Sequence, residues 1–180
     1  MKTIFENIVV SLVIIAQILT ILYIIGLFIR RKNPNSDFVK MLGDNGFKLA
    51  FVVALASTFG SLFYSDVLGY EPCKLCWYQR IFMYPQVLLL GFALWRKEWN
   101  MYFYSLVLSV VGGLIALNHY VLQTTGTSIL PCSAVGYSVS CSKLFVMHLG
   151  YITIPLMALT GFTLMILSIT LWKKTRTESN

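Results

Sequence analysis

The residues with the clearest chemistry are four cysteines that fall into two pairs. Cys73 and Cys76 form a C-x-x-C pair, and Cys132 and Cys141 are separated by eight residues. The C-x-x-C spacing is used by dithiol redox centres, in which a lowered thiol pKa favours thiol–disulfide exchange. The two pairs therefore make redox chemistry at sulfur the first function to test.

Three interpretations of the cysteines compete. Two structural disulfides could fasten loops, but a C-x-x-C ring is tight, and such close spacing is more typical of redox or metal sites. A zinc site is the second, but zinc ribbons usually pair two C-x-x-C motifs, so no metal is expected here. The third is a relay in which one pair exchanges with the other through mixed disulfides, provided that a thiolate reaches a disulfide sulfur.

The residues that follow Cys76 favour the relay. If a helix begins near Cys76, Arg80 lies four residues further along the same face. A helix N-terminus and a guanidinium both favour a thiolate at Cys76. An arginine one turn inside a membrane is costly and is therefore a functional candidate, although it could also extend to the interface. Gln79 accompanies it on the same turn.

His119 is expected at a depth similar to that of Arg80, near the end of a later apolar stretch. A histidine in a membrane helix can hydrogen-bond to a neighbouring helix. It can equally bind a polar head group beside Arg80. The residues alone leave both roles open. His148 is expected at an interface, with a surface role.

The elements that position these residues are apolar helices. Hydrophobic residues make up 57% of the 180-residue chain and charged residues 12%, with a mean hydropathy of +0.74, which is too apolar for an ordinary soluble domain. Five stretches are long enough to cross a hydrocarbon core and lack the alternation of strands. They cover about residues 4–29, 49–67, 77–95, 101–122 and 149–172. The sequence thus predicts an all-α membrane protein with five spans.

The basic residues predict the orientation. Ten of the 14 Lys and Arg residues fall on one side of the predicted spans, which the positive-inside rule makes cytoplasmic. They are Arg30, Arg31, Lys32, Lys40, Lys48, Arg96, Lys97, Lys173, Lys174 and Arg176. The N-terminus is then outside and the C-terminus inside, with all four cysteines on the outer, oxidising side. The net charge of +7 gathers beside apolar spans without a basic-aromatic face, so nucleic acid is not an expected partner and the lipid bilayer is.

The chain is expected to have four parts. Residues 1–30 form an additional transmembrane helix, retained because no A-x-A cleavage site follows it. Residues 31–48 form a polar cytoplasmic connection, residues 49–172 a four-helix redox bundle, and residues 173–180 a cytoplasmic tail.

The motif Cys73-Lys-Leu-Cys76-Trp-Tyr-Gln79-Arg80, followed by Met83-Tyr84-Pro85, resembles the disulfide bond formation protein B family, DsbB, and especially its BdbC-like branch. Pro131-Cys132, Cys141 and the segment from Leu149 to Pro155 resemble the second cysteine loop and last span of that branch. The resemblance covers about residues 47–172. A rival redox family, the vitamin K epoxide reductase type, has its C-x-x-C after the loop pair, whereas here it comes first.

This resemblance implies a four-helix bundle in the cytoplasmic (inner) membrane. Such a bundle oxidises a DsbA-like thioredoxin-fold thiol oxidase and passes the electrons to the membrane quinone pool, either ubiquinone or menaquinone. It implies disulfides Cys73–Cys76 and Cys132–Cys141 at rest, attack by the partner on Cys132, and exchange between Cys141 and Cys73. Cys76 would face the quinone, with Arg80, Gln79 and His119 as quinone-binding residues. The first span is additional to the usual four of the family.

Overall fold

Long helices make up most of the computed structural model, which describes residues 2–33, 36–127, 132 and 140–178. Within these ranges there is no strand, only an isolated bridge between His148 and Ile152. The elements are α1 (Lys2–Lys32), α2 (Asp37–Leu62), a π-helical turn η1 (Phe63–Val67), α3 (Lys74–Arg96), a 3-10 turn η2 (Trp99–Met101), α4 (Tyr102–Thr125) and α5 (Ile154–Glu178).

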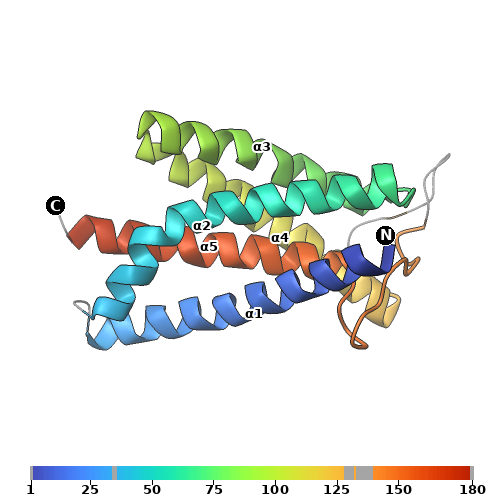
Figure 1. Ribbon diagram of the computed structural model, residues 1–180, viewed down its shortest axis with the longest axis horizontal. Coiled ribbons are helices and arrows are strands. Elements are labelled where there is room, and N and C mark those ends of the chain that lie inside the picture. Colours follow the sequence, from blue (N-terminus) through green and yellow to red (C-terminus); the bar gives the residue numbers. More distant parts are fainter. Residues whose placement is uncertain (1, 34–35, 128–131, 133–139, 179–180) are drawn as a thin grey trace.

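Helices α2 to α5 form a four-helix bundle, in which α2 packs on α3, α3 on α4, α4 on α5 and α5 on α2. Its core contains buried side chains from all four helices, including Phe47, Met83, Ala116 and Phe162. α1 lies outside this ring and packs on α2 and α5 (Figure 1). The predicted all-α architecture is confirmed, with a bundle of four helices and one additional N-terminal helix.

Among the residues that the structure describes, four helical segments are long and apolar enough to cross a membrane. They are Thr3–Lys32, Asp37–Val67, Trp99–Thr125 and Ile154–Thr177. α3, with 23 residues, is not among them, because polar residues such as Gln79, Arg80 and Gln86 interrupt its apolar character. The protein is therefore a multi-pass membrane protein.

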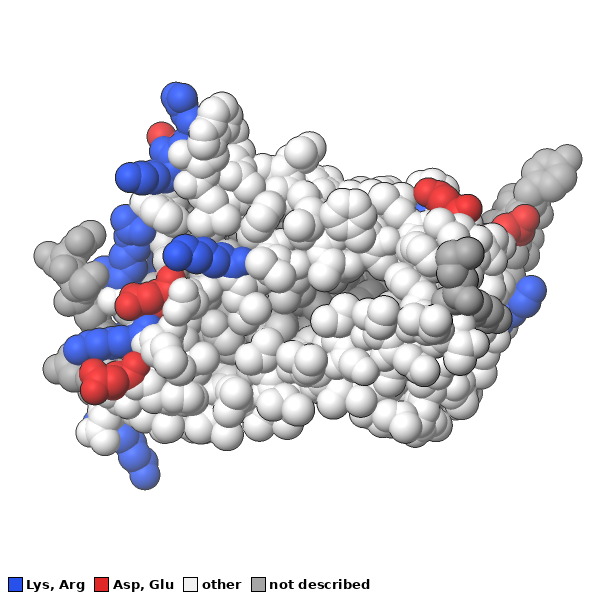
Figure 2. Space-filling view, in the orientation of Figure 1, with Lys and Arg blue, Asp and Glu red and all other residues white. Residues whose placement is uncertain are grey.

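Charged side chains gather at one end of the bundle, and a broad apolar belt covers the middle (Figure 2). At the charged end, α1, α3 and α5 end, and α2 and α4 begin. We call this the basic end and the opposite one the cysteine end. Arg176 lies over the rings of Trp99 and Trp172, and Lys173 lies over Tyr102. Aromatic and basic residues together are typical of a membrane–water interface.

Two glycines allow α5 to approach its neighbours closely. A Cβ at Gly46 of α2 would collide with the backbone carbonyl of Ser168, and one at Gly112 of α4 would collide with the ring of Phe162. Small residues at such crossings let helix backbones pack closely within a membrane. α5 is thereby held at the centre of the contacts with α1, α2 and α4.

A buried hydrogen-bond network joins α3 to α4. The Gln86 Oε1 atom accepts from the hydroxyls of Ser105 (2.7 Å) and Ser109 (3.1 Å), and the Gln86 Nε2 atom donates to the Phe82 carbonyl (3.0 Å). All three side chains are fully buried in the bundle. Because hydrocarbon offers no other partner to these groups, the network fixes how the two helices face each other.

Two predicted boundaries are wrong. α2 begins at Asp37 rather than near residue 49, so the predicted connection 31–48 is largely helical, because Val39, Leu42 and Phe47 are buried against neighbouring helices. The last helix begins at Ile154 rather than at Leu149. Leu149 and Gly150 have φ of 52° and 76°, which a helix cannot continue through.

Candidate redox site

The N-terminus of α3 positions the C-x-x-C pair. Cys73 is the N-cap residue, and its Sγ accepts a hydrogen bond from the Cys76 backbone N–H at 3.4 Å. The next turn brings Cys76 back over the cap, so that the two sulfur atoms lie 3.1 Å apart. Leu75, which lies between the two cysteines in the sequence, is fully buried and packs in a small core with Ile115 and Leu122 of α4.

Cys132 and Cys141 form a disulfide with a Cα–Cα distance of 6.2 Å, within the range for such bonds. This is one of the two disulfides expected from the resemblance; the other, Cys73–Cys76, is not formed, and these two residues are free thiols in the structure. Cys141 is 1% exposed, whereas Cys132 is only partly buried. Cys132 is therefore the more accessible sulfur of the pair.

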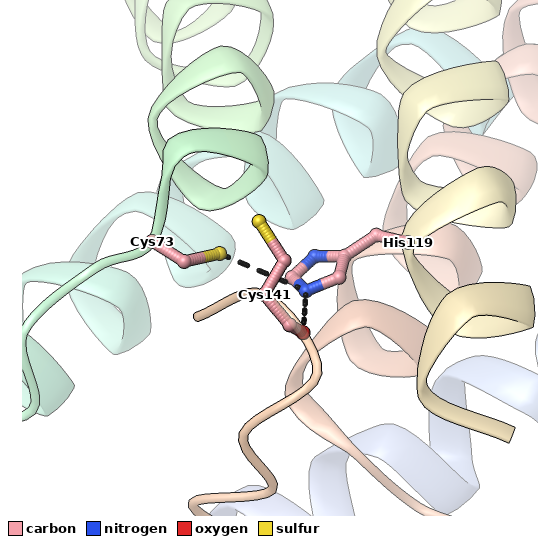
Figure 3. A group of neighbouring side chains, drawn as sticks. All are labelled: Cys73, His119 and Cys141. Carbon is pink, nitrogen blue, oxygen red and sulfur yellow. Dashed lines mark hydrogen bonds between the residues drawn. The ribbon is translucent and has the colours of Figure 1, made fainter. Parts of the chain in front are cut away.

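The two cysteine pairs are adjacent. The Cys73 and Cys141 sulfurs and the ring nitrogens of His119 form a group whose ligand atoms lie within 4.8 Å of one another (Figure 3). Exchange requires a thiolate to reach a disulfide sulfur, and this distance leaves little movement to be made. The expected proximity of the two pairs is thus present in the structure.

His119 of α4 lies between the pairs. The Gln79 Nε2 atom can only donate, and it donates to His119 Nδ1 at 3.0 Å. The proton of a neutral His119 ring therefore lies on Nε2. His119 Nε2 donates to the Cys141 carbonyl at 3.0 Å and faces the Cys73 sulfur at 3.7 Å. Of the two roles that the sequence left open for His119, the hydrogen bond to a neighbouring helix is present, to Gln79 of α3, and the ring lies at the junction of the cysteines (Figure 3).

The same contacts decide which sulfur carries charge. Cys73 accepts the Cys76 N–H, faces His119 Nε2–H, and lies 3.1 Å from the Cys76 sulfur, whose thiol can donate to Cys73 once Cys73 is a thiolate. The Cys76 thiol, and then His119, lower the pKa of Cys73 to about 4 from its usual 9.0, against the opposing effect of burial. The sequence favoured a thiolate at Cys76, whereas the contacts of the folded chain favour one at Cys73.

A metal is a weaker fit to this donor set. Cys73, His119 and Cys141 are close enough to share an ion. Metals bind thiolates, however, and the Cys141 sulfur is bonded to Cys132. While Cys141 is oxidised, only Cys73 and His119 of these three residues keep a strong ligand atom.

A cavity of about 330 Å³, the chamber, opens beside Cys76. Gln79, Arg80 and Cys76 line one part of it, and apolar side chains of α1, α2 and α5 form most of its walls. The Arg80 Nη2 atom donates to the Ser61 carbonyl at 3.1 Å, and Arg80 lies over the Trp77 ring at 5.3 Å. The volume and the few polar groups are typical of a small-molecule site.

Of the three predicted cofactor-binding residues, Arg80 and Gln79 line this chamber, and His119 does not. Sequence reasoning missed Tyr64, which also lines it. Tyr64 lies in the π-helical turn η1, a distortion common at functional sites that has no sequence signal of its own.

A bundle of membrane helices that holds a disulfide against a dithiol with a lowered pKa defines a membrane thiol oxidoreductase. The sequence model described as "Disulfide bond formation protein DsbB" matches residues 44–172. The chain belongs to this family, whose members support disulfide bond formation at the membrane.

The chain is similar to two proteins of Bacillus subtilis (strain 168). It is 42% identical over 130 residues to the SPbeta prophage-derived disulfide bond formation protein B, covering 72% of this chain and 84% of the relative. It is 39% identical over 131 residues to the disulfide bond formation protein C, covering 72% and 93%. The probable disulfide formation protein C 1 of Bacillus anthracis is 42% identical over 113 residues, or 63% and 81%. No solved structure matches the chain.

Proposed function

We propose that this protein reoxidises a DsbA-like, thioredoxin-fold thiol oxidase and passes the two electrons through both cysteine pairs to a membrane quinone. The observation that carries the proposal is the position of Cys73. Its sulfur lies within 4.8 Å of the Cys141 sulfur and 3.1 Å from Cys76, which in turn lines the chamber. One continuous path of sulfurs thus leads from Cys132 to the chamber.

The proposed topology has five spans, with the N-terminus outside the cytoplasmic membrane and the C-terminus inside. α3 packs on α2 and α4 within the bundle, which supports its role as a span despite its polar residues (Figure 1). The basic end then faces the cytoplasm, and the cysteine end faces the extracytoplasmic or periplasmic side. α1 is the additional helix, and α2 to α5 form the redox bundle, with the last turns of α5 on the cytoplasmic side.

Exchange begins at Cys132, the more accessible sulfur. A partner thiolate bonds to Cys132 and releases Cys141, which attacks Cys73 of an oxidised Cys73–Cys76 pair and releases Cys76. The second thiol of the partner then bonds to the first and frees Cys132. Cys132 attacks Cys141, the resting disulfide re-forms, and Cys73 leaves as a thiolate. The partner ends oxidised, and the Cys73–Cys76 pair ends as a dithiol.

The polar contacts favour the last of these steps. A thiol with a lower pKa leaves faster in exchange. The hydrogen bonds from Cys76 and His119 stabilise Cys73 as the charged leaving group. Cys73 is therefore suited to release Cys141 back to Cys132.

A quinone, ubiquinone or menaquinone, supplies an acceptor for the two electrons and two protons of the Cys73–Cys76 dithiol. Arg80 and Gln79 would hold its head group, because they line the chamber together with Cys76. The donor set fits, since a guanidinium presents several N–H groups to a carbonyl oxygen that gains charge. Apolar walls fit the remainder of such a molecule.

The test is quinone reduction by the purified full-length protein, supplied with a reduced thioredoxin-fold oxidase. The unaltered protein should oxidise the partner and reduce one quinone per disulfide formed. Cys76→Ser should stop quinone reduction, because electrons from the partner then have no Cys73–Cys76 disulfide to reach. Oxidation of the partner without quinone consumption in the unaltered protein would refute the electron acceptor.

A further inference from the structure

The additional helix α1 forms a wall of the chamber. The family match begins at residue 44, so all of α1 lies before the matched region. Six apolar residues of α1 nevertheless line the cavity that ends at Cys76: Val9, Leu12, Val13, Ile15, Ala16 and Leu19. A helix outside the conserved family region thus completes a cavity of the redox site.

α1 is fastened on both sides of this wall. Toward the cysteine end, the Phe5 ring stacks on Phe63 with 3.7 Å between centroids. Toward the basic end, the buried Tyr23 hydroxyl donates to the Leu42 carbonyl at 2.9 Å. Between these contacts the surface is hollowed where α1 and α2 separate (Figure 2). The chamber therefore lies where α1 is held away from α2, within the apolar belt.

The chamber has a polar part and an apolar part. Cys76, Gln79 and Arg80 supply the polar part. Tyr64 also lines it: this side chain is only 6% exposed, and its hydroxyl has no hydrogen-bond partner within the part of the chain that the structure describes. A buried hydroxyl without a partner is costly, which points to a ligand that supplies one. Gly60 of α2 also lines the chamber, and a Cβ added there would meet nothing within 4 Å.

We propose that α1 encloses the isoprenoid tail of the quinone, so that the Val13 and Ala16 face of this helix determines the affinity for tailed quinones. The inference rests on the proposed function. The polar part receives the head group beside Cys76, and the tail runs between α1 and α2. The hollow between these two helices is its way to the lipid. The helix thus serves the electron acceptor and not the thiol partner.

Photolabelling of the unaltered protein is the first test. A quinone that carries a diazirine at the end of its tail is bound and irradiated, and labelled peptides are identified by mass spectrometry. Label is expected in residues 9–19 of α1 and should be competed by unlabelled tailed quinone but not by phospholipid. Label confined to α3–α5, or lost to phospholipid, overturns the inference.

A variant that fills the chamber is the second test. Ala16→Phe should raise the dissociation constant of a tailed quinone about tenfold, the loss expected when burial of about two methylene equivalents is prevented. Binding is followed by quenching of tryptophan fluorescence, and a quinone without a tail should bind with an unchanged constant. Ile18→Phe is the matched control, because Ile18 lies on α1, is 53% exposed and does not line the chamber.

Gly60→Leu, which fills the chamber from α2, should reproduce the selective loss. Exchange with the thiol partner, measured in the same preparations, reports that each variant is folded. An unchanged constant for the tailed quinone in folded Ala16→Phe overturns the role of α1. If the unaltered protein neither binds nor reduces quinone, the proposed function itself fails, which is a separate result.

Discussion

His119 is expected to set the acidity of Cys73, and its removal should raise that pKa. A hydrogen bond to a charged group contributes about 1.5–3 kcal/mol. His119 Nε2 lies 3.7 Å from the Cys73 sulfur and also donates to the Cys141 carbonyl, so we use the lower end of this energy range. Since one pKa unit corresponds to about 1.4 kcal/mol, His119→Ala should raise the pKa of Cys73 by about one unit.

The assay is alkylation of the reduced protein as a function of pH, with the modified Cys73 peptide quantified by mass spectrometry. The midpoint should rise in His119→Ala and rise less in His119→Gln, which keeps a donor. His148→Ala is the matched control, because His148 is the only other histidine and lies outside the cysteine cluster. An unchanged Cys73 midpoint in a folded His119→Ala protein would refute the reasoning and leave His119 a packing residue.

Three further predictions follow from the charges. Arg80→Ala should slow quinone reduction at least tenfold, because one hydrogen bond from a charged group is lost, and Arg80→Lys should restore the rate only partly. Thiol–disulfide exchange at Cys132 should not change in either variant. A loss of both activities would contradict a role of Arg80 confined to the chamber. Reporter fusions after residues 40, 98 and 176 should all read cytoplasmic, and one outside reading would overturn the five spans. Folding lowers the pKa of Cys73 from 9.0 to about 4, so the free energy of unfolding of the reduced protein should rise as pH rises from 4 to 9. This gain is lost as pH falls through 4. The same pH dependence of thermal unfolding in Cys73→Ser would contradict a contribution from this thiolate.

The sequence predicted the helices and the cysteine pairs well, because long apolar stretches and the C-x-x-C spacing are local signals. It predicted that His119 lies near the end of its helix but not which residues surround it. Depth in the membrane gives a height along the bundle, whereas the direction of a side chain around the helix depends on how α4 packs. For that reason the sequence left two roles open for His119, and its position against Cys73 could not be predicted.

The sequence favoured a thiolate at Cys76 rather than Cys73 for a related reason. Arg80 and the helix N-terminus are features of the same segment as Cys76, and they were the only charges that the sequence could place nearby. The contacts that favour Cys73 include one from α4, which is 46 residues away in the chain. The start of α2 was also missed, since the burial of Val39 and Leu42 depends on α1 and α5.

The N-cap of α3 links electron transfer to the backbone. The Cys73 sulfur that takes part in exchange also accepts the Cys76 amide hydrogen, so one atom both stores electrons and closes the first turn of a helix. A thiolate is a far better acceptor than a disulfide sulfur, so each reduction tightens this turn and each oxidation loosens it. The amide of Cys76 should therefore exchange with solvent deuterium more slowly in the reduced protein, so that its exchange rate reports the redox state of the Cys73–Cys76 pair.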